Sequence, residues 1–505
     1  MASQTKDEFF EKRKHDGFAL TFDDVLLRGA RARCAPWEID LTTRFTRDVP
    51  LRMPIASAAM SSVTESKMAI ALAKNGGIGS IHRNLPPEEQ ARVVGKVKHH
   101  IHGFIDEPIV AHPYETVAEF LERKEKKGWA YDNFPVVEGT TNKLLGLMTR
   151  HNFKRCDDLN ERIDAVMTPV SDQFTTREDI NINDAYARLK AMDKDVLLTV
   201  RGVVLIGMWS FADVRRVVKG EKPMHNVDHL ERLRVCAAVG VGKEAFLRAE
   251  LLVAKGVDVL HVDMANAWQD FVFDTAKELK AKYKDGPNIM LGNFAVPEAV
   301  HEAIEECNPD GIVVGIGGGS ICTTRKVTGT GVPQITAAYE CAQAAQSFGI
   351  PVCADGGIRH AGDVVMALAV GPESVMVGNL VAGTDETPME RRKLPDGSYE
   401  MDYYGMGAER AMNESSGSRQ RYLQGQGVLI PEGVEGTVPY KGSVEYTLAV
   451  EVGGLRKGLH SNGARTIAEL RTNARFNQVT AAGDRESHIH DIHAAVTPPN
   501  YRGPE

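Results

Sequence analysis

The sequence has no long apolar run. No stretch of the 505 residues approaches the roughly 20 apolar residues that a bilayer-spanning helix needs. Met1–Lys14 also lacks a signal-peptide pattern. No strong charge bias is present, because 60 Lys and Arg stand against 68 Asp and Glu, for a net charge of −8. These absences argue against membrane insertion and against polyanion binding. We expect a soluble, cytoplasmic protein with no specific nucleic-acid partner.

Cysteine is scarce and scattered. The seven cysteines are odd in number and show no CxxC spacing, which argues against a disulfide framework or a zinc site. The pattern fits a reducing compartment. The residues are Cys34, Cys156, Cys236, Cys307, Cys322, Cys341 and Cys353.

Short β-rich runs recur along the chain, and helix-length segments separate most of them. Most of these runs are continuously apolar, as expected of parallel strands buried on both faces. Eight strands with crossover helices predict an α/β fold, a closed (β/α)₈ (TIM) barrel, with an open doubly wound sheet as the alternative. The runs are Met53–Met60, Gly77–His82, Leu233–Val239, Val257–Asp263, Asn288–Asn293, Gly311–Gly315, Pro351–Asp355 and Ser374–Gly378.

Two interruptions break this rhythm. The barrel is predicted over residues 1–102 and 223–505, and residues 103–222 form an insertion with two similar halves, 103–162 and 163–222. Each half has a helix and then a strand pair that ends in "LLGLMTR" or "LIGMWSF", which indicates a tandem module, either regulatory or purely structural. Residues 389–442 are polar and rich in Gly, Ser and Gln, which is typical of a functional lid or of disorder.

Candidate functional residues follow the predicted strands, where barrel chemistry is located. The sixth strand leads into "GIGGGSICTTR", Gly315–Arg325. Glycines let the backbone approach a ligand and turn N–H groups inward. Ser320 adds a hydroxyl, and inward amides would lower the pKa of Cys322 and make its thiolate a nucleophile. We predict that Cys322 bonds covalently to the substrate.

The seventh and eighth strands predict a nucleotide site. Asp355 could accept hydrogen bonds from a ribose diol, and Gly356 and Gly357 suit a phosphate nest. The eighth strand ends in "MVGN", Met376–Asn379. Loops after these two strands are the usual phosphate site of a barrel, although the glycines could simply form tight turns. Together with Cys322, they predict a nucleoside monophosphate whose base faces the thiol.

At this point the chain resembles the inosine 5′-monophosphate (IMP) dehydrogenase family over nearly its whole length. The most specific motifs are "GGGSICTTR" and "RYLQG…PEGVEG". The inserted repeat resembles that family's pair of CBS modules. Further matches are "LTFDDVLL" at Leu20–Leu27, "SAAMSSVTE", "GGIGSIHRN", "GVPQITA", "ADGGIR", "AGTDETP", "VGGLRKG" and "ESHIHD".

The resemblance implies oxidation of IMP to xanthosine monophosphate with NAD⁺, in guanine nucleotide biosynthesis. Cys322 would add to C2 of the purine, hydride would leave, and water would hydrolyse the thioimidate once residues 389–442 close as a flap. Thr324, Arg421 and Tyr422, supported by Glu432, would position and deprotonate that water. Because the pKa of arginine exceeds about 12, Arg421 could act as a base only in a dry site that favours its neutral form.

The resemblance also implies binding residues and partners. Carbonyls of Gly317, Gly319 and Cys322 would hold K⁺, completed by Glu486, Ser487 and His488 of a neighbouring subunit, which implies a homotetramer. Paired CBS modules could join tetramers into octamers and bind adenine or guanine nucleotides as effectors. The substrate residues would be Ser320, Asp355, Gly356, Gly357, Gly378, Asn379, Tyr403, Met406, Gly407, Glu432 and Met60, and Asp263, Asn293, Gly315 and Gly317 would face NAD⁺.

Several residues depart from the family pattern near these positions. They are Met264 and Ala267 in "DMANAWQ", and Ser61, Asn379 and Tyr404. The departures are either neutral drift or signs of an altered cofactor pocket or nucleotide. The second half of the insertion also looks degenerate, so its nucleotide site is open to question.

Two other functions remain open. GMP reductase shares the barrel and the cysteine loop, and "DMAN" and Tyr404 favour it. The Arg421–Tyr422 pair and "HRN", His82–Asn84, favour the dehydrogenase. A catalytically silent nucleotide sensor is the third alternative, which the intact Cys322 and Thr324 oppose.

Overall fold

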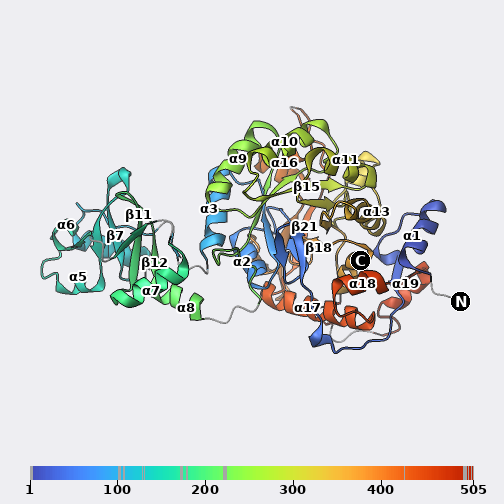
Figure 1. Cartoon of the computed structure of the whole chain (residues 1–505), viewed down its shortest axis with the longest axis horizontal. Helices are drawn as coiled ribbons and strands as arrows, with labels where there is room; N and C mark the ends of the chain where they lie inside the picture. Colours follow the sequence, from blue (N-terminus) through green and yellow to red (C-terminus); the bar gives the residue numbers. More distant parts are fainter. Residues whose placement is uncertain are drawn as a thin grey trace. The chain divides into compact units, whose positions relative to one another are not determined.

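The computed structural model describes residues 4–100, 104–105, 108–127, 129, 131–170, 174–177, 180–219, 224–425, 427–492, 497–498, 500–501 and 503. The chain divides into two compact units (Figure 1). The barrel unit contains residues 1–97, 224–226 and 234–505, and the inserted unit contains residues 98–223 and 227–233.

The barrel unit is built around eight parallel strands that close on themselves, so the predicted (β/α)₈ fold is confirmed. Seven of the predicted runs contain one of these strands each, and the remaining run, Asn288–Asn293, ends one residue before β15 does. In barrel order they are β13 (Cys236–Val239), β14 (Val259–Asp263), β15 (Asn288–Phe294), β16 (Gly311–Val314), β17 (Val352–Asp355), β18 (Ser374–Val377), β4 (Ile55–Ser57) and β5 (Ile78–Ile81).

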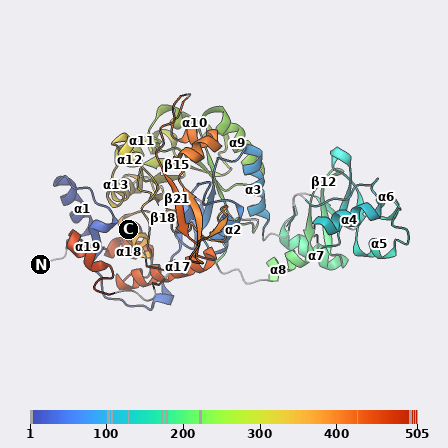
Figure 2. The ribbon, with the colours of Figure 1, turned by 180° about the vertical axis from the view of Figure 1, so that it is seen from behind.

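Helices surround the strands (Figure 2). They are α2 (Ser66–Lys74), α3 (Pro87–His99), α9 (Gly242–Ala254), α10 (Asp270–Lys282), α11 (Pro297–Cys307), α13 (Gln334–Gln346), α14 (Ala361–Val370), α17 (Val444–Ser461) and α18 (Ile467–Asn473). The strands are apolar on both faces because one face packs on these helices and the other fills the barrel.

One core cluster fills the barrel interior. Ile78, Cys236, Val259, Met290 and Val313 belong to it and are fully buried. The hairpin of β2 (Thr43–Thr46) and β3 (Val49–Leu51) contributes to the same cluster. Because strand side chains alternate, residues two and four positions after Val259 on β14 lie on the same face of the strand, toward the carboxyl mouth.

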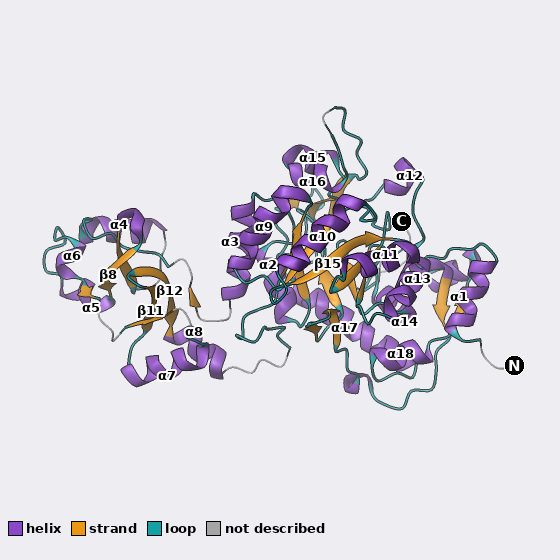
Figure 3. Cartoon of the chain, turned by 45° about the horizontal axis from the view of Figure 1, so that its top comes forward, coloured by secondary structure: helices purple, strands orange, loops and turns teal. Residues whose placement is uncertain are grey.

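Residues 389–442 hold regular structure around that mouth. A three-stranded antiparallel sheet contains β19 (Arg391–Lys393), β20 (Tyr399–Tyr404) and β21 (Glu435–Pro439). The helices α15 (Glu409–Glu414) and α16 (Ser416–Arg421) lie between β20 and β21 in sequence, and Figure 3 shows them together. The short helix α12 (Thr324–Thr328) follows the cysteine loop.

The ends of the barrel unit pack together. The helix α1 (Lys6–His15) buries Phe9 and Phe10, and the rings of Phe10 and Tyr339 stack with centroids 4.4 Å apart. The 3₁₀ helix η1 (Phe22–Asp24) leads into β1 (Val25–Leu27), which pairs with β22 (Phe476–Gln478). The 3₁₀ helix η2 (Pro36–Glu38) follows β1, and α19 (Ala481–Ser487) follows β22.

The inserted unit has its own sheet, in the order β10 (Thr175–Arg177), β11 (Val196–Arg201), β12 (Val204–Ser210), β8 (Lys143–Met148), β7 (Phe134–Glu138). One half has the order α4 (Val117–Lys127), β7, β8, α5 (Arg150–Arg155), and the other has α7 (Ile182–Met192), β11, β12, α8 (Phe211–Lys219). The short elements β6 (Phe104–Ile105), η3 (Gly139–Thr141), α6 (Ile163–Val166) and β9 (Thr168–Pro169) complete it. Both halves therefore show the same helix–strand–strand–helix order.

Among the helices of the described residues, none is both long and apolar enough to cross a membrane.

Candidate active site

A cavity of about 530 Å³ opens at the carboxyl ends of the barrel strands. The loops after β4, β14, β15, β16, β17 and β18 line it, together with parts of residues 403–433. Most of the predicted site residues meet here. Those that line it are Met60, Asp263, Asn293, Gly315, Gly317, Gly319, Ser320, Cys322, Thr324, Asp355, Gly356, Gly357, Gly378, Asn379, Tyr403, Met406, Gly407, Arg421, Tyr422, Glu432 and His488.

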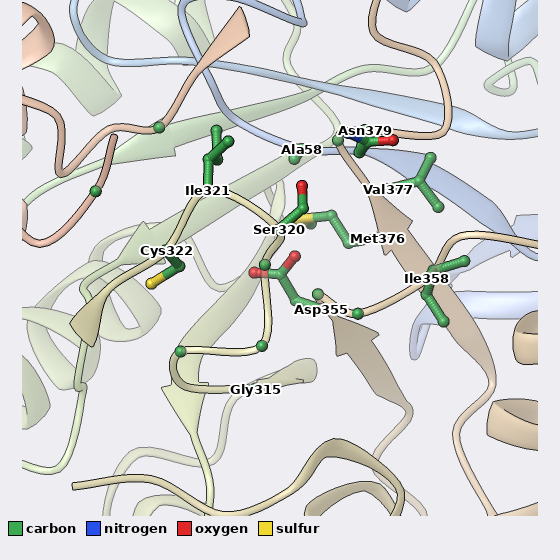
Figure 4. A pocket seen from close by; sticks show the side chains of 18 of the residues that line it. Ala58, Gly315, Ser320, Ile321, Cys322, Asp355, Ile358, Met376, Val377 and Asn379 are labelled. Carbon is green, nitrogen blue, oxygen red and sulfur yellow. The ribbon is translucent and has the colours of Figure 1, made fainter. Parts of the chain in front are cut away.

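The half-buried thiol of Cys322 is the nucleophile that this cavity offers. Figure 4 shows Cys322 and Ser320 on the loop after β16, with Asp355 on the neighbouring strand end. Cys322 Sγ donates to Thr324 Oγ1 at 3.2 Å. The N–H of Thr323 donates to Glu432 O at 2.9 Å, so the thiol loop is joined to the segment that carries Glu432.

Two glycines shape this loop. Gly315 has a φ of +146°, and a Cβ there would lie 1.9 Å from Asp355 O. Gly317 has a φ of +71°, and a Cβ would lie 2.5 Å from Arg325 Cγ. Any other side chain would therefore clash as well as strain the backbone, so Gly315 keeps the loop close to β17 and Gly317 keeps it close to the side chain of Arg325.

At the opposite end of the cavity, glycine residues lie beside the ends of longer side chains. Gly356 and Gly357 both have positive φ. A Cβ on Gly378 would lie 2.9 Å from Tyr403 Oη and 3.2 Å from Met60 Sδ, so these side chains converge on a bare backbone. Such an arrangement suits an anion held by N–H and O–H donors. Arg359, which the sequence analysis missed, also lines this end and pairs with Asp23.

The carboxylate of Asp355 is held from β15. Asn293 Nδ2 donates to Asp355 Oδ2 and to Gly315 O, each at 2.8 Å. Burial raises the pKa of Asp355 to about 6, and the bond from Asn293 opposes that rise. Asn293 Oδ1 has no hydrogen-bond partner among the described residues, so it remains an open acceptor beside the cavity.

A buried ion pair occupies the side of the cavity next to β14. Arg421 Nε lies 3.0 and 2.9 Å from the two carboxylate oxygens of Asp263, and Arg421 Nη1 donates to Tyr422 Oη at 3.0 Å. Burial disfavours the charge of Arg421, but the adjacent Asp263 outweighs burial and raises the pKa of Arg421 above its ordinary value. In this conformation Arg421 is a guanidinium, so the arrangement opposes the neutral form that a base role needs.

Tyr422 is also held in its protonated form. Burial raises the pKa of Tyr422 to about 12, although Arg421 opposes this. A Cβ on Gly407 would lie 2.8 Å from Tyr422 Cζ, so this glycine makes room for the tyrosine ring.

His261 is a cavity residue that the sequence analysis missed. It lies on β14 between Val259 and Asp263, and only 1% of it is exposed. Neither ring nitrogen has a hydrogen-bond partner within the described part of the chain. Burial lowers the pKa of His261 to about 4, so the imidazole is neutral near pH 7. The period-two spacing from Asp263 was the signal that could have identified it.

Two predicted residues and most departures lie off the cavity. Glu486 and Ser487 belong to α19 and do not line it, whereas His488 does. Gly319 O, a predicted cation ligand, accepts the N–H of Cys322 at 3.0 Å and keeps one lone pair. Of the departures, Asn379 lines the cavity, whereas Ser61, Met264, Ala267 and Tyr404 do not.

A cavity at the carboxyl ends of barrel strands, lined by a cysteine beside a threonine hydroxyl and by a glycine-rich nest, is typical of a barrel enzyme that acts on a phosphorylated substrate. The sequence model described as "IMP dehydrogenase / GMP reductase domain" matches residues 19–490. The chain therefore belongs to the IMP dehydrogenase / GMP reductase family.

Individual relatives cover almost the whole chain. Inosine-5′-monophosphate dehydrogenases of Pasteurella multocida and Escherichia coli K12 are each 42% identical over 488 residues, which is 96% of this chain and 98% of theirs. That of Aquifex aeolicus is 41% identical over 502 residues, 97% of this chain and 99% of its own. Among solved structures, a GMP reductase variant from Trypanosoma brucei in complex with guanosine 5′-monophosphate is 36% identical. It has a TM-score of 0.79, covering 94% of this chain and 98% of its own.

Proposed function

We propose that this protein is an IMP dehydrogenase, which oxidises IMP to xanthosine monophosphate with NAD⁺ as the hydride acceptor. One observation carries the proposal: the thiol of Cys322 and the Arg421–Tyr422 pair line the same cavity. The thiol suits a covalent oxidation, and the pair suits a later reaction with water. The dehydrogenases that are about 42% identical over nearly the whole chain support it.

The first half-reaction takes place at Cys322. Its thiolate adds to C2 of the hypoxanthine ring, and loss of the C2 hydride, for which bound NAD⁺ would supply the acceptor, leaves C2 oxidised as a thioimidate on Cys322. Thr324 Oγ1 accepts the S–H hydrogen bond of the resting thiol. Asp355 is placed to accept from the ribose hydroxyls, while Ser320, Gly357, Gly378 and Tyr403 face the phosphate. Met406 and Gly407 line the base.

The second half-reaction is hydrolysis. Water adds to C2, the thiolate leaves, and a 2-oxo group results, with one proton released. The guanidinium of Arg421 and the hydroxyl of Tyr422 orient that water, and Thr324 and Glu432 assist. Because Asp263 holds Arg421 charged, Arg421 can take up the proton only after that ion pair loosens. We propose that residues 389–442 close as the flap that brings Arg421 and Tyr422 to this water.

NAD⁺ would lie against Asp263, Asn293, Gly315 and Gly317. The open acceptor Asn293 Oδ1 fits the amide donor of a nicotinamide. The bound dinucleotide would supply a hydride acceptor at C2. In this structure Arg421 is bonded to the carboxylate of Asp263. The flap helix and the nicotinamide would therefore take turns at the side of the cavity next to Asp263.

The remaining assignments extend the same proposal. Carbonyls of Gly317, Gly319 and Cys322 would hold K⁺ with Glu486, Ser487 and His488 of a neighbour in a homotetramer. We assign the inserted unit as a CBS pair, with boundaries near 103–162 and 163–222, that takes adenine or guanine nucleotides and could join tetramers into octamers. The seven cysteines are all unpaired, which supports a cytoplasmic setting.

GMP reductase is the second candidate. The likeness to the Trypanosoma brucei enzyme and the "DMAN" segment favour it. Asp263 and Ala265 of that segment line the cavity, whereas Met264 and the adjacent Ala267 do not and are both fully buried. The difference of Met264 and Ala267 from the dehydrogenase pattern is therefore accommodated in the packing around the site.

Two parallel assays decide between these reactions. With IMP, NAD⁺ and potassium chloride, we expect reduced nicotinamide to accumulate, as followed by its absorbance. We expect Cys322→Ala to lower that rate at least about 10³-fold, because no other group can form the thioimidate. The half-buried Cys34 provides the control, and Cys34→Ala should retain the rate.

The reverse pattern would identify the reductase. Consumption of NADPH with GMP, and no reaction with IMP, would overturn the dehydrogenase proposal. Failure of both reactions, with stoichiometric IMP-protected labelling of Cys322 by a 6-chloropurine nucleotide, would point to a silent nucleotide sensor.

A further inference from the structure

Two consecutive residues after β5 hold the helix that carries Arg421. Arg83 Nη1 donates to Gln420 Oε1. Asn84 Nδ2 donates to Ser418 Oγ at 2.9 Å. Arg83, Asn84, Ser418 and Gln420 do not line the nucleotide cavity, so these contacts serve α16 and not a bound nucleotide.

The packing beneath α16 is built for close approach. A Cβ on Gly417 would lie 2.6 Å from Arg83 O, so the helix rests directly on the backbone of the β5 loop. A Cβ on Gly240 would lie 1.9 Å from Gln420 Oε1 and 2.0 Å from Arg83 Nη1, so only glycine leaves room for this bond. Gln420 Nε2 also donates to Val241 O at 3.2 Å, after β13.

The contact between Arg83 and Gln420 also brings the guanidinium groups of Arg83 and Arg421 near the same carboxylate. Arg83 is 2% exposed, and burial lowers its pKa to about 10, while Asp263 opposes that fall. Arg83 and Arg421 thus share the field of one carboxylate. Docking of α16 brings a second guanidinium toward Asp263, and that repulsion offsets part of the hydrogen bonding. The docked state is consequently sensitive to the loss of one bond.

We propose that Arg83 and Asn84 are positioning residues that dock α16 and so set Arg421 and Tyr422 for the hydrolytic half-reaction alone. The proposal rests on the dehydrogenase function for its catalytic consequence. It explains the "HRN" motif, His82–Asn84, because the second and third residues of this motif hold the flap helix in place. The oxidation at Cys322 does not require docked α16, since the nicotinamide would need the side of Asp263 that Arg421 occupies.

The test separates the two half-reactions. In Arg83→Met, we expect the rate of the first turnover of reduced nicotinamide to stay within about twofold, because the thiol loop is untouched. We expect the steady-state rate to fall about 10- to 100-fold, the range that loss of one charged, buried hydrogen bond gives. The thioimidate on Cys322 should then accumulate and appear as added mass on acid-quenched protein.

Matched variants guard against a purely structural effect. Gln420→Ala removes the same bond from the helix side, together with the bond to Val241 O, and Arg83→Met combined with Gln420→Ala should be no worse than Gln420→Ala alone. Arg83→Lys keeps a donor and should recover part of the steady-state rate. Arg471→Met removes a guanidinium that pairs with Glu373 at 3.2 Å, before β18 at the other end of the barrel, and should leave the ratio of first-turnover to steady-state rate unchanged.

A readout without turnover tests docking itself. Amide hydrogen exchange at residues 416–425 of the substrate-free protein should be faster in Arg83→Met and Asn84→Ala than in wild type, with no change in β14 or β16. Unchanged exchange, or an equal fall of both rates, would overturn the proposal. Faster exchange in a protein that does not oxidise IMP would uphold docking and reject the dehydrogenase function. If Arg83→Met does not fold, Asn84→Ala and Gln420→Ala carry the test.

Discussion

At the scale of single residues, the buried His261 and the half-buried Asp355 depart from their ordinary pKa values in opposite senses within one cavity. His261 has a pKa of about 4 and Asp355 a pKa of about 6, and burial causes both. Each group is therefore held nearer to its neutral form. A neutral imidazole and a carboxyl group with a raised pKa would suit the planar base and the ribose hydroxyls of the proposed substrate.

His261 makes the wild type less stable as the pH falls. Because its folded pKa lies below the unfolded value of about 6.5, the unfolded chain binds more protons between about pH 6.5 and 4. We expect His261→Leu to gain stability over wild type across that window as the pH falls, by up to about 3 kcal/mol. Unfolding midpoints of both proteins, measured across this pH range, check it, and a constant difference would contradict it.

Asp355 works in the opposite direction. Its folded pKa exceeds the unfolded value of about 3.9, so its contribution to stability is present below that pH and is lost as the pH rises to about 6. As the pH rises from about 3.9 to about 6, we expect the free energy of unfolding of Asp355→Asn to increase relative to that of wild type, by up to about 3 kcal/mol. It should also weaken IMP binding through the ribose. Denaturation at matched pH and a calorimetric titration with IMP give the two answers.

The sequence could place Cys322 and Asp355 in one cavity because Asp355 ends β17 and Cys322 lies in the glycine-rich loop after β16. It could not show that Arg421 pairs with Asp263, since 158 residues separate them and only the folded flap joins them. The expectation that a dry site favours neutral Arg421 considered burial but not this carboxylate. His261 was missed because a single histidine in an apolar run is more often a core residue than a cavity residue.

At the scale of elements, the cysteine loop is held by the side chain of Arg325. Arg325 Nε donates to Ile316 O at 2.9 Å, and its guanidinium also reaches Val332 O. The start of the loop and the residues after α12 are thereby joined. Gly317 lies against the side chain of Arg325. The absence of a Cβ at Gly317 therefore helps Arg325 to hold the loop that carries Cys322.

Gly317 and Gly329 form a matched pair for testing this support. Both have a φ of +71°, but a Cβ on Gly329 would meet no atom within 4 Å. Gly329→Ala should cost only the backbone strain of about 1–2 kcal/mol. Gly317→Ala should cost more and slow the first turnover, because it displaces Arg325. Melting temperatures and first-turnover rates are the measurements, and equal effects of the two variants would refute a bracing role.

The sequence predicted the barrel strands better than it predicted the structure of residues 389–442. All eight barrel strands were found because continuous apolar runs between turns are a strong signal. Residues 389–442 read as a polar loop, yet β20 and β21 pair across about 30 residues of intervening chain, a long-range contact that no local pattern reveals. The two α16 contacts from Arg83 and Asn84 were hidden for the same reason.

At the scale of the whole molecule, the inserted unit leaves and rejoins the barrel unit near residues 97 and 224. Within the inserted unit, Lys98 Nζ and Asp228 Oδ2 form a buried ion pair of 3.0 Å. Each unit has its own hydrophobic clusters, so we expect the two to be separable.

A chain in which a glycine–serine linker replaces residues 98–223 tests that separation. Asp228→Asn should accompany the deletion, since its buried partner Lys98 is removed. We expect the shortened enzyme to keep its turnover within about threefold, because the described residues that line the cavity all belong to the barrel unit. Any effect of ATP or GTP on the full chain should disappear, and a persistent effect would place the effector site in the barrel unit.

The hold of α16 on Asp263 has a consequence for pharmacology. A tethered helix is an internal competitor present at a fixed effective concentration, which no dilution lowers. If α16 undocks as we propose, a compound that needs Asp263 would show its intrinsic dissociation constant divided by the fraction of protein in which α16 is undocked. Two relatives with identical contact residues would then differ in drug sensitivity if their flap helices dock with different stability. Selectivity could be sought in the residues that dock the helix.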